Sequence, residues 1–329
     1  MNSILVLGDT SQAHFYRALL SPCGYAVREA ATATDAKTAL RGGFPTVVLW
    51  ILKDPREVLG MAKAIAGLDA TDAVAPPLCV VALTHTREPA YLRAALECKG
   101  VRALLALDES GHPDARDLLV TVAQICAPRV IDAHDYLSKS QIERSMNLTS
   151  SVEKGEALDI VRRAAAEIGC NPYVISTVVT TAEEMISNAF HHGPVDDRGR
   201  HTYSSLPRSV PITLPHERRV TLTFAADDKR LCVSVLDRFG SLRVASLAAR
   251  LASCLHPSGA QIAGDEGGAG IGMLMALRDM HGLAFNVLPG QATQVVALAR
   301  RSRSFREFRI HPKSFGFFCG AEHGNHLGV

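Results

Sequence analysis

The chain has 329 residues, of which 47% are hydrophobic and 21% charged, and its formal net charge is +2. This length allows two domains of ordinary size, and this composition excludes a disordered or fibrous protein. The small net charge gives no indication of a nucleic-acid partner.

Three observations predict a cytoplasmic protein without membrane contact. The start, MNSILVLGDT, lacks the basic segment and long apolar run of a signal peptide. No apolar run reaches the roughly 18–20 residues that span a bilayer. The eight cysteines are scattered, with neither a CxxC pair nor zinc-site spacing, which suits a reducing compartment.

The first half, residues 1–127, alternates short apolar runs with amphipathic segments. The apolar runs predict five strands, at residues 3–8, 25–30, 45–52, 78–84 and 101–107. Between and after them, helical patterns cover residues 11–24, 34–43 and 114–126. Strands that are apolar on both faces and alternate with helices predict an α/β domain with a doubly wound, five-stranded parallel sheet.

A short polar segment, residues 128–142, is interpreted as a linker to a domain at residues 143–300. In this domain a strand and two helices are followed by a loop rich in Pro, Arg and Ser, residues 194–217. Four more strands are predicted, at residues 219–228, 230–238, 283–290 and 293–301. This order predicts an α/β sandwich with a mixed or antiparallel sheet, unlike the first half.

The second helix of this domain contains the stretch TTAEEMISNAFHHG, residues 180–193. Glu184, Asn188 and His192 are four residues apart, so they share one helix face beside an apolar stripe. An Asn oxygen can bind Mg²⁺, and a Glu can deprotonate a nucleophile one turn away. A solvated helix face explains the pattern equally well, and a His-His metal site lacks a third ligand.

A strand then leads into Asp237, and Gly240 follows three residues later. An Asp at a strand end can accept a hydrogen bond from an exocyclic amine, and a Gly lets a flat ring approach the backbone. An ordinary Asp-initiated turn is the alternative.

Three glycines, Gly268, Gly270 and Gly272, precede the last helix of this domain. A helix N-terminus favours phosphate, but neither the dinucleotide fingerprint nor the phosphate-loop motif is present. These glycines therefore bind phosphate in another setting or begin a helix.

The order E-x-x-x-N, strand-D-x-x-G and G-x-G-x-G resembles the GHKL, or Bergerat-fold, ATP-binding family over residues 143–300. The stretch AEEMISNAFHHG is most similar to the anti-sigma-factor serine/threonine kinases of that family. Two features depart from the pattern: Leu242 replaces a second glycine, and the 194–217 loop is longer than in the compact kinases.

The resemblance implies ATP and Mg²⁺ as cofactors and assigns a role to each candidate residue. Glu184 would be the general base, Asn188 would hold Mg²⁺, and Asp237 would bind the adenine amine with Gly240 against the base. The glycines would cradle the phosphates, His192 would contact phosphate or lid, and residues 241–267 would form the lid. The implied partner is a protein, such as a small anti-sigma-factor-antagonist-like domain.

The first half resembles a response-regulator receiver domain without its phosphorylation chemistry. Gly8 replaces one acidic residue, leaving Asp9, and Ile51 stands at the phosphoacceptor position. Leu107 stands at the lysine position, whereas the hydroxyl position is retained as Thr84. Aspartyl phosphorylation needs a nucleophilic carboxylate and a cation. We therefore predict a pseudo-receiver for docking, dimerisation or ligand sensing, and a homodimer.

The leading functional hypothesis is a bacterial signalling protein that uses Mg-ATP to phosphorylate Ser or Thr of a partner. A binding module that responds to ATP without phosphate transfer is the alternative. A histidine-kinase-like protein, with His134 as acceptor, is a third hypothesis. Only about twenty residues join the halves, too few for its two long dimerisation helices.

The C-terminal extension, residues 301–329, combines basic and aromatic residues. We predict that its Phe side chains pack on the domain while its Arg side chains stay solvated. Binding of nucleic acid or anionic lipid is the less favoured alternative.

Overall fold

The computed structural model describes residues 2–8, 10–31, 35–36, 38–39, 45–52, 79–85, 89–98, 100–255, 269–302 and 304–320. Two compact units divide the chain: Met1–Ala127 with Ser314–Gly316, and Pro128–Lys313 with Phe317–Val329. Strands and helices occur in both, which confirms the predicted α/β class. Within the described residues no helix is both long and apolar enough to cross a membrane.

Five parallel strands form the sheet of the first unit. They are β1 (Ser3–Leu7), β2 (Ala26–Ala30), β3 (Val47–Ile51), β4 (Val80–Thr84) and β5 (Val101–Ala106), and their order is β2-β1-β3-β4-β5. This is the strand order of flavodoxin-like doubly wound sheets, in which ligands bind at the carboxyl ends of the strands. Residues Ser314–Gly316 of β11 (Ser314–Cys319) continue the unit, with Phe315 and Gly316 antiparallel to β5.

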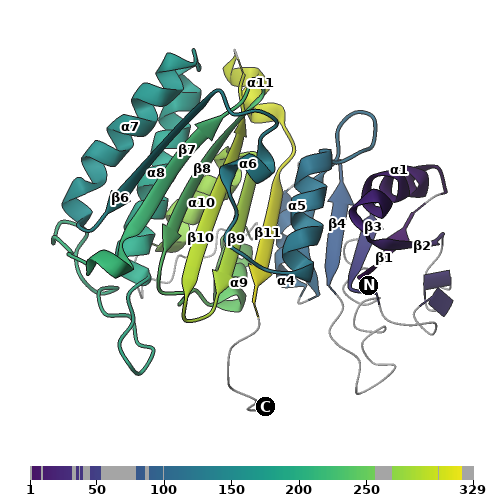
Figure 1. Cartoon of the computed structure of the whole chain (residues 1–329), viewed down its shortest axis with the longest axis horizontal. Helices are drawn as coiled ribbons and strands as arrows, with labels where there is room; N and C mark the ends of the chain where they lie inside the picture. The colour runs from purple at the N-terminus through teal and green to yellow at the C-terminus, as the bar shows by residue number, and fades with distance from the viewer. Residues whose placement is uncertain are drawn as a thin grey trace. The chain divides into compact units, whose positions relative to one another are not determined.

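Helices α1 (Thr10–Leu20), α4 (Pro89–Glu97) and α5 (Ala115–Cys126) accompany these strands (Figure 1). All five residues of β4 are buried, as expected for a parallel strand between helical layers. Helix α5 begins after Asp114, whose carboxylate accepts hydrogen bonds from the N–H groups of Arg116 and Asp117.

The second unit has five antiparallel strands in the order β9-β10-β8-β7-β6. They are β6 (Ile142–Leu148), β7 (Val220–Ala226), β8 (Arg230–Asp237), β9 (Gly282–Leu288) and β10 (Ala292–Arg300). Helices α7 (Lys154–Glu167), α8 (Pro172–His192) and α10 (Ala269–Asp279) lie on one face, and α9 (Val244–Cys254) packs on α10 (Figure 1).

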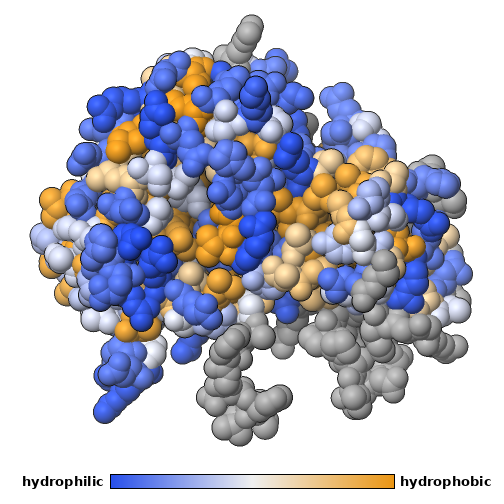
Figure 2. All heavy atoms as spheres, viewed as in Figure 1, coloured by the Kyte–Doolittle hydropathy of each residue, from blue (hydrophilic) through white to orange (hydrophobic). Residues whose placement is uncertain are grey.

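The short helix α6 (Ala133–Tyr136) lies on the opposite face of this sheet (Figure 1). Figure 2 views the molecule from this side and shows hydrophilic and apolar side chains interspersed. Such a mixture is ordinary for a protein surface and indicates no binding site.

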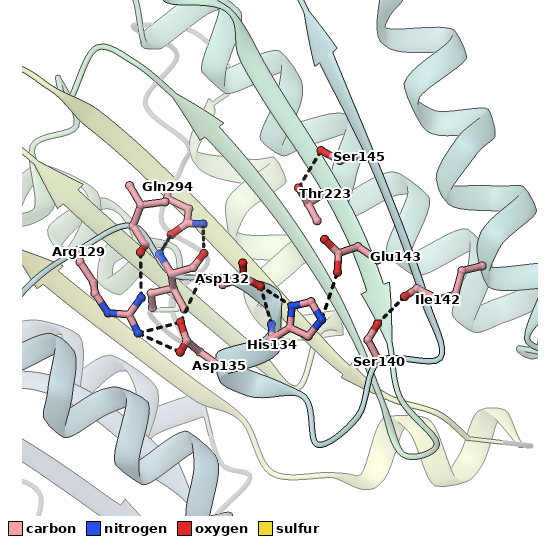
Figure 3. Close-up of polar contacts among 12 residues, drawn as sticks. Arg129, Asp132, His134, Asp135, Ser140, Ile142, Glu143, Ser145, Thr223 and Gln294 are labelled. Atoms are coloured by element: carbon pink, nitrogen blue, oxygen red, sulfur yellow. Dashed lines mark hydrogen bonds and ion pairs between the residues drawn. The ribbon is translucent and has the colours of Figure 1, made fainter. Parts of the chain in front are cut away.

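Residues 128–142, predicted as a linker, belong to the second unit and are held on its sheet. Gln294 of β10 accepts a hydrogen bond from Ile131 N–H at 2.7 Å and donates to Ile131 C=O at 2.7 Å (Figure 3). His134 lies between Asp132 and Glu143, at 2.7 and 3.4 Å, and its hydrogen bond to Asp132 raises the pKa of the imidazole. All three side chains are largely exposed, so these ion pairs contribute little to stability.

The C-terminal extension contains α11 (Phe305–Ile310) and β11. Its phenylalanines at 308, 315, 317 and 318 are buried, as predicted. The prediction of solvated arginines is wrong for Arg301, which donates hydrogen bonds to Gln141 Oε1 and Asp227 C=O at 2.9 Å and also to Ile168 C=O. The Arg301 side chain is therefore held by two backbone carbonyls and a glutamine side chain, although the composition predicted that it would be solvated.

Candidate functional site

Helix α8 carries the predicted catalytic and metal-binding residues. Its first turn is fixed by Asn171, whose side chain accepts a hydrogen bond from Tyr173 N–H, and by Pro172. The predicted apolar stripe is buried except for Ile175, which is half-buried because Val174 takes the inner position. This packing fixes the rotation of the helix and leaves Glu184, Asn188 and His192 at intermediate exposure.

Glu184 lies between a loop arginine and a glycine of α10. Arg208 Nη1 donates to Glu184 Oε2 at 2.8 Å, and Nη2 donates to Oε1 at 3.0 Å. On the other side, a Cβ added to Gly272 would clash with Cγ and Cδ of Glu184. A side chain at position 272 would therefore displace the carboxyl group of Glu184. The carboxylate in turn raises the pKa of the Arg208 guanidinium.

Asn188 is one turn further along α8. Its Oδ1 is buried and has no hydrogen-bond partner among the described residues. A buried acceptor without a donor is costly unless a ligand satisfies it. An amide oxygen in this state fits Mg²⁺, which prefers oxygen ligands. No group of three or more His, Cys, Asp or Glu that could hold a metal occurs in the described part of the chain.

Asp237 ends β8 and lies beside the C-terminus of α8. A Cβ on Gly193, the residue after α8, would lie 3.3 Å from Asp237 Cγ and 3.2 Å from the Phe239 ring. Asp237 is 6% exposed, and burial raises the pKa of its carboxyl group to about 6, opposed by hydrogen bonds from the N–H groups of Phe239 and Gly240. The predicted helix and the predicted Asp turn therefore meet in the fold.

Gly240 has a φ of +63°, which only glycine adopts without strain. A Cβ there would also clash with the backbone of the β9–β10 turn, at Leu288 C=O and Gly290 N–H. The turn thus explains this glycine fully without a ligand. The next residue, Ser241, donates its hydroxyl to the carbonyls of His192 and Gly193, at 3.2 and 2.7 Å, and ties the turn to α8.

His192 is held in its neutral form. Burial lowers the pKa of this imidazole to about 4, and the nearby His201, Arg208 and Arg250 act in the same direction. It therefore offers one N–H donor and one acceptor at neutral pH. Its neighbour His191 is 6% exposed, with Nδ1 3.4 Å from Tyr203 C=O.

The glycine-rich segment is only partly within the described residues. Gly270 and Gly272 lie in the first turns of α10, whereas Gly268 is outside the described residues. Of the predicted lid, residues 241–255 are described and contain helix α9. The structure thus brings Glu184 against Gly272 and Gly193 against Asp237, from segments that are far apart in the sequence.

Arg208 and Gly193 were missed as participants in the site. Gly193 had a signal, because glycine after a helix is a common C-terminal feature. No sequence signal indicated Arg208, because a loop without periodicity does not show which of its arginines approaches a helix. Lys154 was also missed; its Nζ lies 3.1 Å from Glu183 Oε1 and 3.3 Å from Ser187 Oγ.

Two residues at the carboxyl edge of the first unit, predicted to replace phosphorylation residues, are apolar and buried. Ile51 is 5% exposed, and Leu107 is 3% exposed. A Cβ on Gly8 would lie 2.5 Å from Ile51 Cδ1, so the side chain of Ile51 fills the space above Gly8. Thr84 ends β4 and is buried, whereas Asp9 lies outside the described residues.

A comparison of the sequence with protein-family models and with curated proteins finds no match. Similar solved structures include a CheY-like protein, tadZ, from Pseudomonas aeruginosa, with 14% identity over 40% of this chain and 98% of that chain and a TM-score of 0.31. The Saccharomyces cerevisiae receiver domain of Ssk1, in complex with Ypd1, has 16% identity over 41% and 96%, with a TM-score of 0.30. The Salmonella typhimurium RcsB response regulator has 16% identity over 60% and 96%, with a TM-score of 0.31.

Proposed function

We propose that the second unit binds Mg-ATP and transfers the γ-phosphoryl group to a Ser or Thr hydroxyl of a partner protein. The first unit would be a receiver-like regulatory module that cannot itself be phosphorylated. Two contacts support this proposal: Glu184 of α8 packs against Gly272 of α10, and Gly193 at the end of α8 lies beside Asp237. A small domain that resembles anti-sigma-factor antagonists is the partner that the family resemblance implies.

Asp237 would accept a hydrogen bond from an exocyclic amine. The carboxylate lies at the end of a central strand, where it also accepts hydrogen bonds from the protein, among them one from Phe239 N–H at 2.9 Å. Burial strengthens a hydrogen bond to a ligand because water competes less for the acceptor. Adenine offers this donor, whereas guanine presents a carbonyl in the equivalent place.

Asn188 would hold Mg²⁺ through Oδ1, the buried oxygen that has no partner among the described residues. When bound, this ion supplies positive charge to the phosphate oxygens. Gly270 and Gly272 leave the first turns of α10 without side chains, so backbone N–H groups can approach an anion.

Glu184 would accept the proton of the attacking hydroxyl. The hydroxyl oxygen forms a bond to the γ-phosphorus, the bond to the ADP oxygen breaks, and the proton passes to the carboxylate of Glu184. Phosphoserine or phosphothreonine and ADP leave, and Glu184 returns its proton to water.

A binding module without phosphate transfer is the second candidate, and one observation favours it. Both carboxylate oxygens of Glu184 are held by Arg208 in this structure. In that arrangement ATP would only set the conformation of a partner-binding surface.

Calorimetric titration of wild type with Mg-ATP tests the shared part of both candidates. Asp237→Ala and Asn188→Ala should each weaken binding by about tenfold or more, which corresponds to the loss of a buried polar contact. Asn147→Ala is the matched control, because Asn147 lies on β6 and accepts a hydrogen bond from Thr221. Unchanged affinity in both site variants would contradict ATP binding here.

Labelled ATP and candidate partners then separate the two candidates. Phosphate transfer that disappears in Glu184→Gln while ATP binding persists supports the kinase. ATP-dependent partner binding without transfer by wild type supports the binding module.

A further inference from the structure

Arg208 forms the most direct polar contact to the predicted base. Its guanidinium binds both oxygens of Glu184, at 2.8 and 3.0 Å, and its own side chain is 46% exposed whereas that of Glu184 is 13% exposed. Arg208 is therefore the more accessible partner of the pair. An accessible guanidinium can change partners without unpacking the core.

The segment that carries Arg208 contains a turn and is anchored on its C-terminal side. The turn closes where Val210 N–H donates to Pro207 C=O at 3.0 Å. Further on, Ile212 N–H donates to Ser151 Oγ at 2.9 Å and Leu214 N–H donates to Thr149 C=O at 2.7 Å. The side chains of Ile212 and Leu214 are buried. Arg208 therefore lies in a turn that is followed by two anchored residues, and its side chain reaches Glu184 of α8.

Glu184 separates Arg208 from the start of α10. One side of its carboxyl group meets Arg208, and Gly272 packs against the other. The carboxyl group of Glu184 thus lies between the Arg208 guanidinium and the first turns of α10. In the proposed function these turns face the phosphates. Lys154, another cation on this side of α8, is paired with Glu183 at 3.1 Å.

We propose that Arg208 binds the terminal phosphate of ATP and releases Glu184 when it does so. This inference rests on the proposed function and adds a phosphate-binding residue to it. A guanidinium binds carboxylate and phosphate in the same bidentate geometry, and the terminal phosphate carries the greater negative charge. ADP lacks that phosphate, so it leaves the Arg208–Glu184 pair intact. Glu184 is then free to accept a proton only when ATP is bound.

The test compares the affinities for Mg-ATP and Mg-ADP by calorimetry in full-length variants. Arg208→Gln should weaken ATP binding about tenfold and ADP binding less than about twofold. Arg208→Lys should recover part of the ATP affinity because it keeps the charge but loses the bidentate geometry. Arg200→Gln is the matched control, since Arg200 is in the same loop and pairs with Asp196 at 2.8 Å.

A second experiment uses Glu184→Gln, which removes the negative charge that competes with phosphate for Arg208. It should tighten ATP binding several-fold, roughly threefold or more, without changing ADP binding. This gain should vanish in Arg208→Gln/Glu184→Gln. Thermal unfolding of each variant checks that the unit remains folded.

Equal loss of ATP and ADP affinity in Arg208→Gln would overturn the inference while leaving the proposed function intact. A gain in Glu184→Gln that persists without Arg208 would overturn it too. Absence of ATP binding to wild type would overturn the proposed function and this inference together.

Discussion

Ile51 lies directly over Gly8, so that a Cβ on residue 8 would be 3.4 Å from Ile51 Cβ and Cγ1 and 2.5 Å from Cδ1. These are the predicted phosphoacceptor position and a predicted acidic position, and the two residues that occupy them are in close apolar contact. A carboxylate at either position alone would be strained or would be a buried charge without compensation.

A double-mutant cycle tests this contact. Gly8→Ala should cost about 1–3 kcal/mol by overpacking, and Ile51→Ala should cost about 2–4 kcal/mol by leaving a cavity. Because the second change removes the atoms that clash with the first, the double variant should be at least about 1 kcal/mol more stable than additivity requires. Denaturant unfolding measures all four proteins. Strict additivity would show that Gly8 and Ile51 do not share this space.

Gly272→Ala should disturb Glu184. The new Cβ would overlap Cγ and Cδ of Glu184, so the carboxylate must move away from Arg208 or α10 must shift. We expect a loss of about 1–3 kcal/mol in the free energy of unfolding and a loss of phosphate transfer. Gly155→Ala in α7 is the control, because nothing lies within 4 Å of its added Cβ. That change should be neutral or stabilising by up to about 1 kcal/mol.

Asp237→Asn should stabilise the protein at pH 8 while weakening ATP binding. Burial in the folded state raises the pKa of Asp237 to about 6 from its ordinary value of 3.8. Between these pH values the folded state binds more protons than the unfolded state, so stability falls as pH rises through the window. A neutral amide removes this cost, which is about 2–3 kcal/mol above pH 6. Thermal unfolding of both proteins at pH 8 and pH 4 measures it.

The advantage of Asp237→Asn should shrink to less than about 1 kcal/mol at pH 4, where the folded carboxyl group is protonated and the unfolded one is partly protonated. If Asp237→Asn changed the stability by the same amount at pH 8 and at pH 4, titration of Asp237 would not be the cause of the change.

His281 should make the second unit sensitive to acid. The imidazole accepts from Arg300 N–H at 2.6 Å and donates to Phe308 C=O at 2.7 Å, and burial lowers the pKa of the ring to about 3. Below about pH 6.5 the unfolded state takes up a proton that the folded state does not, so acidification favours unfolding. By pH 5 this contribution amounts to about 2 kcal/mol.

His281→Gln lacks this titration and keeps a donor and an acceptor. It should be less stable than wild type at pH 7 by about 1–2 kcal/mol, and the difference should shrink between pH 7 and pH 5. Denaturant unfolding at these two pH values measures the change. A constant difference would mean that His281 takes up its proton equally in both states.

Much of the local structure could be predicted from residue patterns. The apolar spacing of α8 indicated its buried stripe from Val178 onward, because helical periodicity is a local property. The five apolar runs of the first half correspond to β1–β5. In β1, β3, β4 and β5 most residues are buried, and strands buried on both faces read as continuous hydrophobic segments, whereas β2 is mostly half-buried. Gly240 was identified as special, and its positive φ explains why.

The sequence by itself determined the two-part α/β organisation and the candidate residues Glu184, Asn188 and Asp237. Only the tertiary structure decided that Gly272 packs against Glu184, that Gly193 lies beside Asp237, and that residues 128–142 are held on the sheet by Gln294. It also decided that Arg208 binds Glu184. Periodicity and turn chemistry act over a few residues, whereas these contacts join segments 24 to 163 residues apart. Such contacts depend on how whole elements pack, and no local pattern encodes that packing.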